Sequence, residues 1–230
     1  MKISEIFYSL QGEGALLGVP SFFIRTTGCN LRCVWCDTPY TSWTPVGEEM
    51  AIDLIVRKAL EHPGRHAVVT GGEPLIAPEI GALTAALREA GFHITIETAG
   101  TVAPVAFTVT CDLMSISPKL SNSTPWEREG GRFAAQHERL RYRPEVLREL
   151  MAAYNYQLKF VVMQESDLDE IRKLLKETDG AIDRTMLMPE GIQLETLRER
   201  AKWMVDVCKS EGFRFSPRLH IDLFGNQRGT

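Results

Sequence analysis

The stretch SFFIRTTGCNLRCVWC, residues 21–36, joins a run of apolar and β-branched residues to three closely spaced cysteines. The apolar part has the length and composition of a buried strand. Cys29, Cys33 and Cys36 follow it, separated by three and then two residues, so they lie in a loop at the strand's C-terminal end. Such a loop can turn three thiolates toward one point, which predicts a metal centre.

Three thiolates fit a [4Fe–4S] cluster that leaves one iron open to a ligand from outside the protein. Zinc is the competing metal, but a structural zinc site takes four protein ligands. The nearest histidine is His62, and the chain has no second CxxC pair. A non-catalytic iron–sulfur or zinc-binding module stays open as an alternative to a catalytic cluster.

Outward from this stretch, short apolar runs alternate with longer amphipathic ones. Strands are expected at 66–70, 93–98, 115–117, 157–163, 185–189 and 213–223, and helices at 51–62, 82–91, 146–154, 168–177 and 194–210. This alternation predicts an α/β fold with mostly parallel strands. Periodicity does not separate a partial or complete barrel from a doubly wound sheet, but in both the chemistry collects at the C-terminal strand ends.

The length of 230 residues, with 44% hydrophobic and 24% charged residues, predicts one globular domain over 1–230. Residues 120–144 break the alternation, since they carry five arginines with Gly, Pro and Ser and show no strand pattern. We expect a long surface loop with a helical piece there, as an insertion that is either a functional lid or a solvated ornament.

The formal net charge of −4 gives no general affinity for nucleic acid or for anionic membrane. The N-terminal MKISEIFYSLQGEG lacks the apolar run of a secretory signal, and no segment has the length of a membrane span. Clustered cysteines fit a reducing compartment. A cytoplasmic protein with no nucleic-acid or membrane partner is therefore expected.

The spacing CxxxCxxC, with the aromatic Trp35 before Cys36, resembles the radical S-adenosylmethionine superfamily. The resemblance implies a partial (β/α)6 barrel in which the three cysteines hold a [4Fe–4S] cluster and the open iron binds S-adenosylmethionine. It also implies that an electron from the cluster cleaves this cofactor to a 5′-deoxyadenosyl radical. A flavodoxin or ferredoxin is the expected electron donor.

The turn in HAVVTGGEP, residues 66–74, matches the superfamily's cofactor segment, so the resemblance implies that Gly71, Gly72 and Glu73 bind the methionine end of S-adenosylmethionine. Taken alone, two glycines after a strand indicate either a tight turn or close approach of the backbone to a ligand. The other cofactor residues expected from the resemblance are Trp35, Glu97, Ser117, Pro118, Lys119, Met188, Pro189, Glu190 and Gly191.

Residues 6–41, IFYSLQGEGALLGVPSFFIRTTGCNLRCVWCDTPYT, closely resemble the 7-carboxy-7-deazaguanine synthase family, and the end FSPRLHIDLFGNQRG is similar to the C-terminus of many members. The resemblance implies a lyase of queuosine and 7-deazapurine biosynthesis. Its substrate would be 6-carboxy-5,6,7,8-tetrahydropterin, whose ring contracts with loss of ammonia to give 7-carboxy-7-deazaguanine. Family members also suggest a homodimer.

The family resemblance assigns Arg25 to the substrate carboxylate, which suits a guanidinium fork, and Thr38 to Mg²⁺. Unaided, Arg25 would be interpreted as part of a surface ion pair and Thr38 as part of an ordinary turn. His220, expected on the last strand, is a substrate residue or a structural histidine. The remaining substrate residues expected from the family are Leu10, Gln11, Gly12, Glu13 and Thr70.

A glycyl-radical-enzyme activase is the nearest alternative. Such an activase shares the cluster motif and the small barrel, but it abstracts hydrogen from a protein. It would not explain the LQGEG stretch at residues 10–14 or Thr38.

Overall fold

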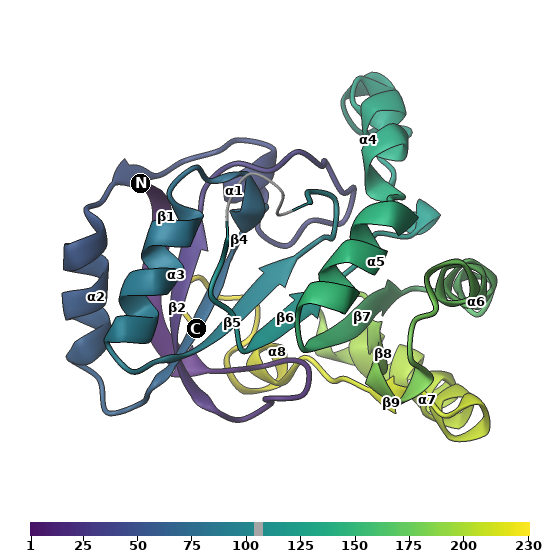
Figure 1. Cartoon of the computed structure of the whole chain (residues 1–230). Helices are drawn as coiled ribbons and strands as arrows, with labels where there is room; N and C mark the ends of the chain where they lie inside the picture. Colours follow the sequence, from purple (N-terminus) through teal and green to yellow (C-terminus); the bar gives the residue numbers. More distant parts are fainter. Residues whose placement is uncertain (104–107) are drawn as a thin grey trace.

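The computed structural model describes residues 1–103 and 108–230, and these form one nine-stranded sheet (Figure 1). Its strands are β1 (Lys2–Leu10), β2 (Pro20–Thr26), β3 (Glu48–Glu49), β4 (His66–Gly71), β5 (His93–Thr98), β6 (Leu113–Ile116), β7 (Tyr156–Val162), β8 (Thr185–Pro189) and β9 (Arg214–Phe215). The α-helices are α1 (Pro39–Ser42), α2 (Ile52–Leu60), α3 (Ile80–Glu89), α4 (Ala134–Arg141), α5 (Pro144–Ala153), α6 (Asp167–Thr178), α7 (Leu194–Glu211) and α8 (Leu219–Phe224).

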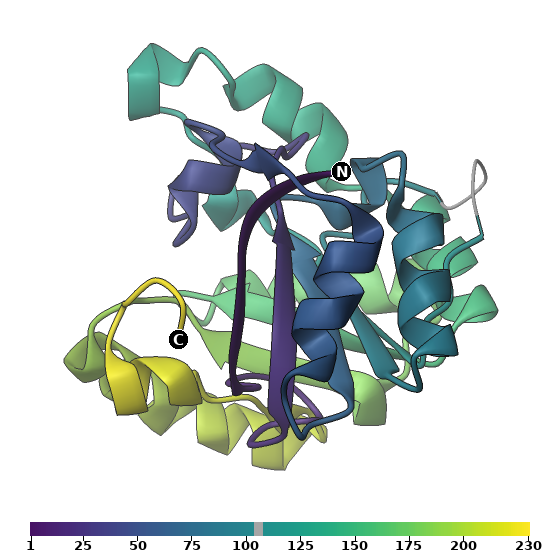
Figure 2. The ribbon, with the colours of Figure 1, turned by 90° about the vertical axis from the view of Figure 1, so that its left-hand side faces the viewer.

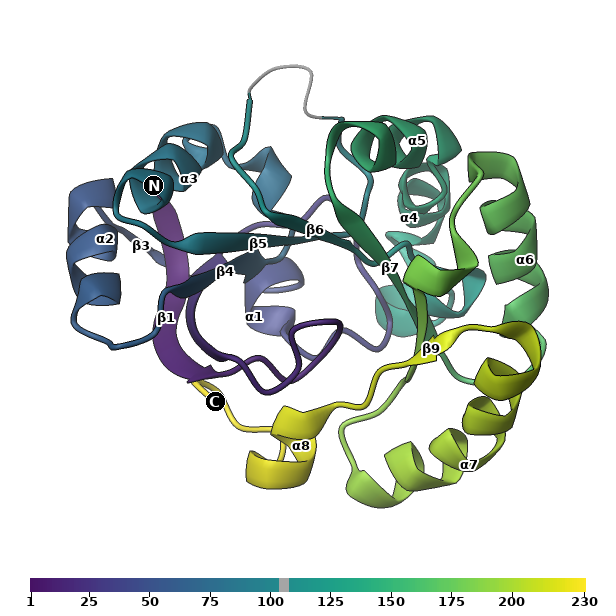
Figure 3. The same ribbon diagram turned by 60° about the horizontal axis from the view of Figure 1, so that its bottom comes forward.

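The order of the strands in the sheet is β3-β1-β2-β4-β5-β6-β7-β8-β9. From β2 to β9 all neighbours are parallel and follow the order of the chain, whereas β1 pairs antiparallel with β2 and β3. A doubly wound sheet would reverse direction at a switch point, and this one does not. The sheet curves with α2, α3, α5, α6 and α7 on its outer side (Figure 3), which confirms the predicted partial barrel.

Alternation along the parallel strands separates the core from the inner face of the barrel. Ile24, Val69 and Ile96 are fully buried in the main hydrophobic cluster, together with helix residues. Their neighbours Arg25 and Thr70 point to the opposite face, because successive strand side chains alternate. The outer positions are therefore apolar, and polar side chains collect on the inner face at the C-terminal strand ends.

The helices lie where the amphipathic pattern predicts them. In α3, Ile80, Leu83 and Leu87 are fully buried at spacings of three and four residues, which place them on one face. Pro144 begins α5, where its missing N–H costs no hydrogen bond. Gly212 ends α7 with φ of 81°, a left-handed conformation that glycine adopts without steric cost.

The predicted last strand at 213–223 is wrong. Only Arg214–Phe215 pair with β8, and the ladder ends where the N–H of Ser216 donates to Leu187 O at 2.9 Å. Pro217 has no N–H with which to continue it, and the chain turns into helix α8. His220 therefore lies on a helix and not on a strand. Sequence reasoning also missed β1 as the first strand of the sheet.

Residues 120–144 hold the 3-10 turns η3 (Ser121–Ser123) and η4 (Arg128–Gly131), followed by helix α4. This segment and the loop that leads into α1 lie side by side at one end of the barrel (Figure 2). The N–H of Val34 donates to Ser123 O at 2.8 Å, so the two segments are directly bonded. None of the helices in the described part of the chain is long and apolar enough to cross a membrane.

Candidate active site

A cavity of about 330 Å³ opens at the C-terminal ends of the parallel strands. The predicted residues that line it are Leu10, Gln11, Gly12, Glu13, Arg25, Trp35, Thr38, Thr70, Gly71, Gly72, Glu97, Ser117, Lys119, Met188, Glu190 and His220. Residues distant in the sequence thus meet in one cleft, as expected for parallel strands whose ends share one edge.

The three cysteines lie together at this edge, in a small cluster with Leu31, Trp35 and Ala99. All three are free thiols in the structure. Burial raises the pKa of the Cys29 thiol to about 12. Burial also raises the pKa of the Cys33 thiol, and the neighbouring Cys36 and Cys29 raise it further. The backbone N–H of Leu31 donates to Cys29 Sγ at 3.4 Å. Three neighbouring sulfurs, of which one is buried and two are half-buried, fit a [4Fe–4S] cluster together with an N–H donor. Among the described residues, no group of three His, Cys, Asp or Glu side chains has a geometry that could hold a single metal ion.

The glycine turn after β4 packs directly against the start of the cysteine loop. A Cβ on Gly72 would lie 2.1 Å from Gly28 O and 2.8 Å from Cys29 Cβ, so no larger residue fits. Gly71 has φ of 139°, which only glycine adopts readily. The turn therefore brings bare backbone to the cavity wall beside the cysteines.

Glu73 does not line the cavity, although the sequence predicts it as a cofactor residue. Its carboxylate is fully buried and accepts hydrogen bonds from Thr98 Oγ1 and from the N–H groups of Ala99 and Leu75, at 2.8 to 3.1 Å. In the structure Glu73 ties the glycine turn to the end of β5. Pro118, Pro189 and Gly191 also lie outside the cavity lining.

Arg25 points into the cavity from the end of β2. Its Nε donates to Glu5 Oε1 at 2.6 Å, and its guanidinium lies 5.6 Å from the centre of the Phe7 ring. Its two terminal nitrogens make no hydrogen bond to the described residues. The side chain is thus fixed from one side, with the fork of the guanidinium free to bind an anion.

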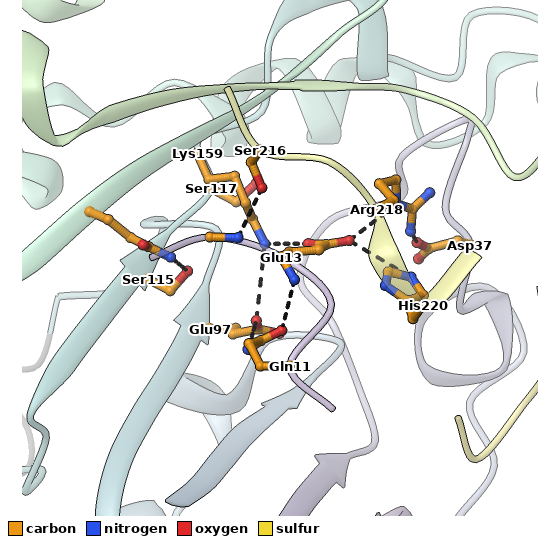
Figure 4. Close-up of polar contacts among 12 residues, drawn as sticks. Gln11, Glu13, Asp37, Glu97, Ser115, Ser117, Lys159, Ser216, Arg218 and His220 are labelled. Carbon is orange, nitrogen blue, oxygen red and sulfur yellow. Dashed lines mark hydrogen bonds and ion pairs between the residues drawn. The ribbon is translucent and has the colours of Figure 1, made fainter. Parts of the chain in front are cut away.

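Glu13 is at the centre of a buried network of charges (Figure 4). Its carboxylate pairs with Lys159 Nζ, and its Oε1 accepts from Arg218 Nε at 3.1 Å. Burial alone would raise the pKa of Glu13, but the charges of Lys159 and Arg218 outweigh it and hold the pKa far below its usual range. Gln11 extends the network, since its Nε2 donates to Glu97 Oε1 at 3.2 Å.

Arg218 joins three segments at the cavity wall. Besides Glu13, it bonds Asp37, the residue after the last cysteine, and donates from Nη1 to Gly191 O at 2.6 Å. Burial would lower the pKa of Arg218, yet the two carboxylates raise it, so the guanidinium stays charged. His220, two residues further on, has its Nε2 3.9 Å from Glu13 Oε1, and burial lowers its pKa.

The loop after the cysteines places Thr38 in the cavity, with its Oγ1 3.8 Å from Cys36 Sγ. After β6, Lys119 Nζ donates to Ser117 Oγ at 2.7 Å and lies 5.8 Å from the centre of the Trp35 ring. Trp35 donates its indole N–H to Asn122 O at 3.1 Å. The ring thereby connects the cysteine loop to the segment at residues 120–144.

Sequence reasoning missed Lys159, Arg218, Asp37 and His137. Lys159 is a single charge in the otherwise apolar strand QLKFVVM, and a buried lone charge was the signal available. His137 is buried, and its Nδ1 accepts from the N–H of Arg32 at 3.1 Å. Its Nε2 donates to Ser123 Oγ at 2.9 Å, because that hydroxyl itself donates to Leu120 O. The sequence alone offers little indication of the role of His137, because no predicted strand or motif places this residue near the cysteines.

The sequence profile of the Radical SAM superfamily matches residues 23–107, which include the cysteine loop and the glycine turn. The 7-carboxy-7-deazaguanine synthase of Rhodopirellula baltica is 45% identical over all of this chain and 89% of the relative. The chain belongs to the 7-carboxy-7-deazaguanine synthase family. The member from Halobacterium salinarum is 42% identical, over all of this chain and 93% of the relative.

The fold agrees with this membership. The crystal structure of QueE from Escherichia coli superposes with a TM-score of 0.68 at 27% sequence identity, covering 95% of this chain and 94% of that one. Membership confirms the predicted cofactors, a [4Fe–4S] cluster and S-adenosylmethionine. It also decides against a glycyl-radical-enzyme activase and against a non-catalytic metal-binding module.

Proposed function

We propose that this member of the family converts 6-carboxy-5,6,7,8-tetrahydropterin to 7-carboxy-7-deazaguanine and ammonia, for 7-deazapurine biosynthesis. The observation that carries the proposal is one cavity in which Arg25, with a free guanidinium fork, and the ionised Glu13 face the space beside the cysteine loop. A bicyclic substrate with a carboxylate at one end and N–H donors at the other matches these two groups.

Cys29, Cys33 and Cys36 would hold the cluster, and Gly71 and Gly72 would approach the cofactor with their backbone. When bound, the cluster and S-adenosylmethionine would supply the radical chemistry that removes a hydrogen from the substrate. The protein's contribution is to hold the substrate at the correct position and to exclude water.

Arg25 would bind the substrate carboxylate. Glu5 fixes its Nε from behind, so the two terminal nitrogens reach the ligand with little loss of rotamer freedom. Tyr40 also donates to Glu5 Oε1, at 2.8 Å, which keeps the Glu5 carboxylate in place. A bidentate pair of this kind sets both the position and the orientation of the carboxylate.

The amino-pyrimidine end of the substrate offers N–H donors, which need acceptors that are permanently charged or fixed. Glu13 is such an acceptor, because Lys159 and Arg218 keep it ionised. Gln11, Thr70 and His220 also line the cavity. The ring would therefore be held by its edge, with its carboxylate directed to Arg25.

Thr38 is proposed to bind Mg²⁺ together with substrate oxygens and water, since magnesium keeps much of its water shell. The cofactor would further contact Trp35, Glu97, Ser117, Lys119, Met188 and Glu190. Glu73 would not contact the cofactor directly but would hold the glycine turn in position. The enzyme is proposed to work as a homodimer and to receive its electrons from a flavodoxin or ferredoxin.

Anaerobic turnover tests this function. The reconstituted enzyme with S-adenosylmethionine, reductant, Mg²⁺ and the carboxylated tetrahydropterin should form a deazaguanine, recognised by its ultraviolet spectrum and mass, with one ammonia per product. A Cys33→Ala variant is the matched control. Protein that holds about four irons and four sulfides per chain and still releases neither product would refute the proposal.

A further inference from the structure

The outer side of the cysteine loop carries a group of arginines stacked on aromatic rings. Arg32 and Arg132 lie 5.3 and 5.0 Å from the centre of the Phe133 ring. That ring meets Trp43 edge-on at 5.7 Å, and Arg128 lies 3.8 Å over Trp43. We call these three arginines with the two rings the arginine cluster.

None of the three arginines pairs with an acid in the described part of the chain. Arg32 donates to the carbonyls of Cys29 and Leu31, and Arg128 donates to Val34 O at 2.9 Å. By contrast, Arg141 in the same segment is bound by Glu138 and Glu170. The segment also holds exposed Glu127 and Glu129, which lie outside ion-pair distance of these arginines. The positive charge of the cluster is thus not neutralised, although the chain as a whole is acidic.

The arginine cluster is bonded to the backbone of the cysteine loop itself. Trp43 donates its indole N–H to Cys33 O at 3.0 Å, and Arg128 holds the next carbonyl, that of Val34. Val34, between two of the cysteines, is 37% exposed. The arginine cluster thus contacts the backbone of Cys33 itself and of Val34, the residue next to it.

The same surface is separate from the substrate cavity. None of Arg32, Val34, Arg128, Arg132 and Phe133 lines that cavity. A protein bound there would leave the cavity free for substrate and cofactor. It would also approach the cluster from the side that the cavity does not use.

We propose that the arginine cluster is the docking surface for an acidic protein that carries single electrons, and that the electron enters at Cys33 and Val34. This inference rests on the proposed function, which needs the cluster reduced by one electron as the carrier is oxidised by one. Electron transfer becomes rapid only over short distances, so a carrier must dock close to the cluster. Unpaired cations beside the loop attract an acidic carrier and orient it.

The composition of the surface fits a protein partner better than a nucleic acid. Trp126, in the same segment, is 64% exposed, and Arg and Trp are the residue types enriched at protein interfaces. Exposed Val34 and Trp126 therefore add apolar surface to the two segments that carry the arginines. Encounters of electron-transfer proteins are small and weak, which such a patch can support.

The test uses Arg132→Glu, because Arg132 makes no hydrogen bond to the cysteine loop. Reduction of the cluster in the holoenzyme by a reduced, acidic bacterial flavodoxin is followed by anaerobic stopped flow over a range of salt concentrations. We expect the reaction to slow by roughly tenfold at low salt and to lose most of its salt dependence. Arg132→Lys, which keeps the charge, should restore most of the rate.

Arg65→Glu is the control, since Arg65 likewise lies over a ring, that of Phe92, but is just before β4, at the opposite end of the barrel. Turnover with dithionite reports the proposed function independently of docking, and Arg132→Glu should leave it unchanged. Equal flavodoxin kinetics in Arg132→Glu and Arg65→Glu would overturn the proposal. So would unchanged flavodoxin kinetics combined with a loss of tRNA binding or of a dimer in Arg132→Glu.

Discussion

Arg218 Nε lies 3.1 Å from Glu13 Oε1, although 205 residues separate the two in the sequence. The contact joins the turn after β1 to the segment that follows β9, and Arg218 also reaches Asp37 beside the last cysteine. The charge state of one buried carboxylate is thereby tied to the positions of three loops. This arrangement gives the cavity a fixed acceptor and predicts how the cavity responds when a partner is removed.

Lys159→Met should strongly destabilise the protein, because it leaves the buried Glu13 with one cation fewer. Breaking a buried ion pair from one side costs about 3–5 kcal/mol, and the remaining Arg218 should reduce the loss to about 2–3 kcal/mol. Chemical denaturation of parent and variant measures the difference. The variant should also bind the pterin less tightly, since burial then raises the pKa of Glu13.

The double variant Lys159→Met with Glu13→Gln is the control for this pair. Removing both charges should cost less than the sum of the two single changes, because no unpaired charge remains. Losses that simply add would mean that Lys159 and Glu13 do not interact in solution.

Arg25→Lys should weaken binding of the substrate about 10- to 100-fold, since an ammonium cannot reproduce the bidentate fork. Binding of S-adenosylmethionine should change much less. Titrations of the two ligands separate these effects, and Arg57→Lys, an exposed arginine on α2, is the control. Equal losses for both ligands would remove Arg25 from the substrate carboxylate.

Local patterns in the sequence predict the α/β fold and the metal centre, and the family resemblance adds the partial barrel and most of the site residues. Apolar strands, the cysteine spacing and the glycine turn are each readable over a few residues. Arg25, Thr70 and Glu97 lie on the inner face by simple alternation, and Lys159 shares that face. Its single charge in an apolar strand would have identified it, had alternation been followed along β7.

Other features depend on tertiary contacts that no local pattern contains. Helix α8 replaces the predicted last strand because Pro217 ends the ladder, and Leu219 donates its N–H to Gly12 O at 2.9 Å. Glu73 matches a cofactor motif, yet its oxygens are used by Ala99 and Thr98. Such partners are known only once the chain is folded.

His137→Leu should loosen the cysteine loop, because the N–H of Arg32 loses its buried acceptor, at a cost of about 1–3 kcal/mol. Loss of cluster iron to a chelator should become faster, on the order of tenfold. The visible absorbance of the cluster reports the rate. His137→Asn retains an acceptor in a similar position and should lie closer to the parent. Identical rates in all three proteins would show that His137 does not hold the loop.

His66 predicts a pH dependence of stability. It is buried between Ser21 and Thr95, and burial lowers its pKa from the ordinary value of about 6.5 to about 4. Below pH 6.5, His66 is therefore protonated in the unfolded chain but stays neutral in the folded protein. The free energy of unfolding falls as the pH falls. Between pH 6.5 and 5 this contribution is about 2 kcal/mol. Denaturation of His66→Gln should show a shallower decline, and a slope equal to the parent's would contradict the assignment.

Thr38→Ala should reduce the response of turnover to added Mg²⁺ several-fold and leave the iron and sulfide content unchanged. The hydroxyl is one ligand among several, so binding of the ion should weaken rather than disappear. Activity measured against Mg²⁺ concentration, with metal analysis on the same samples, tests this. A magnesium response identical to the parent's would exclude Thr38 as a ligand.

The most direct test of the central claim is the ratio of deazaguanine formed to S-adenosylmethionine consumed during anaerobic turnover. The hydrogen taken from the substrate is proposed to return from 5′-deoxyadenosine, which regenerates the cofactor. The account predicts many products for each S-adenosylmethionine lost, with ammonia equal to product. Consumption of one S-adenosylmethionine per product, or no deazaguanine from protein that holds its cluster, would contradict it.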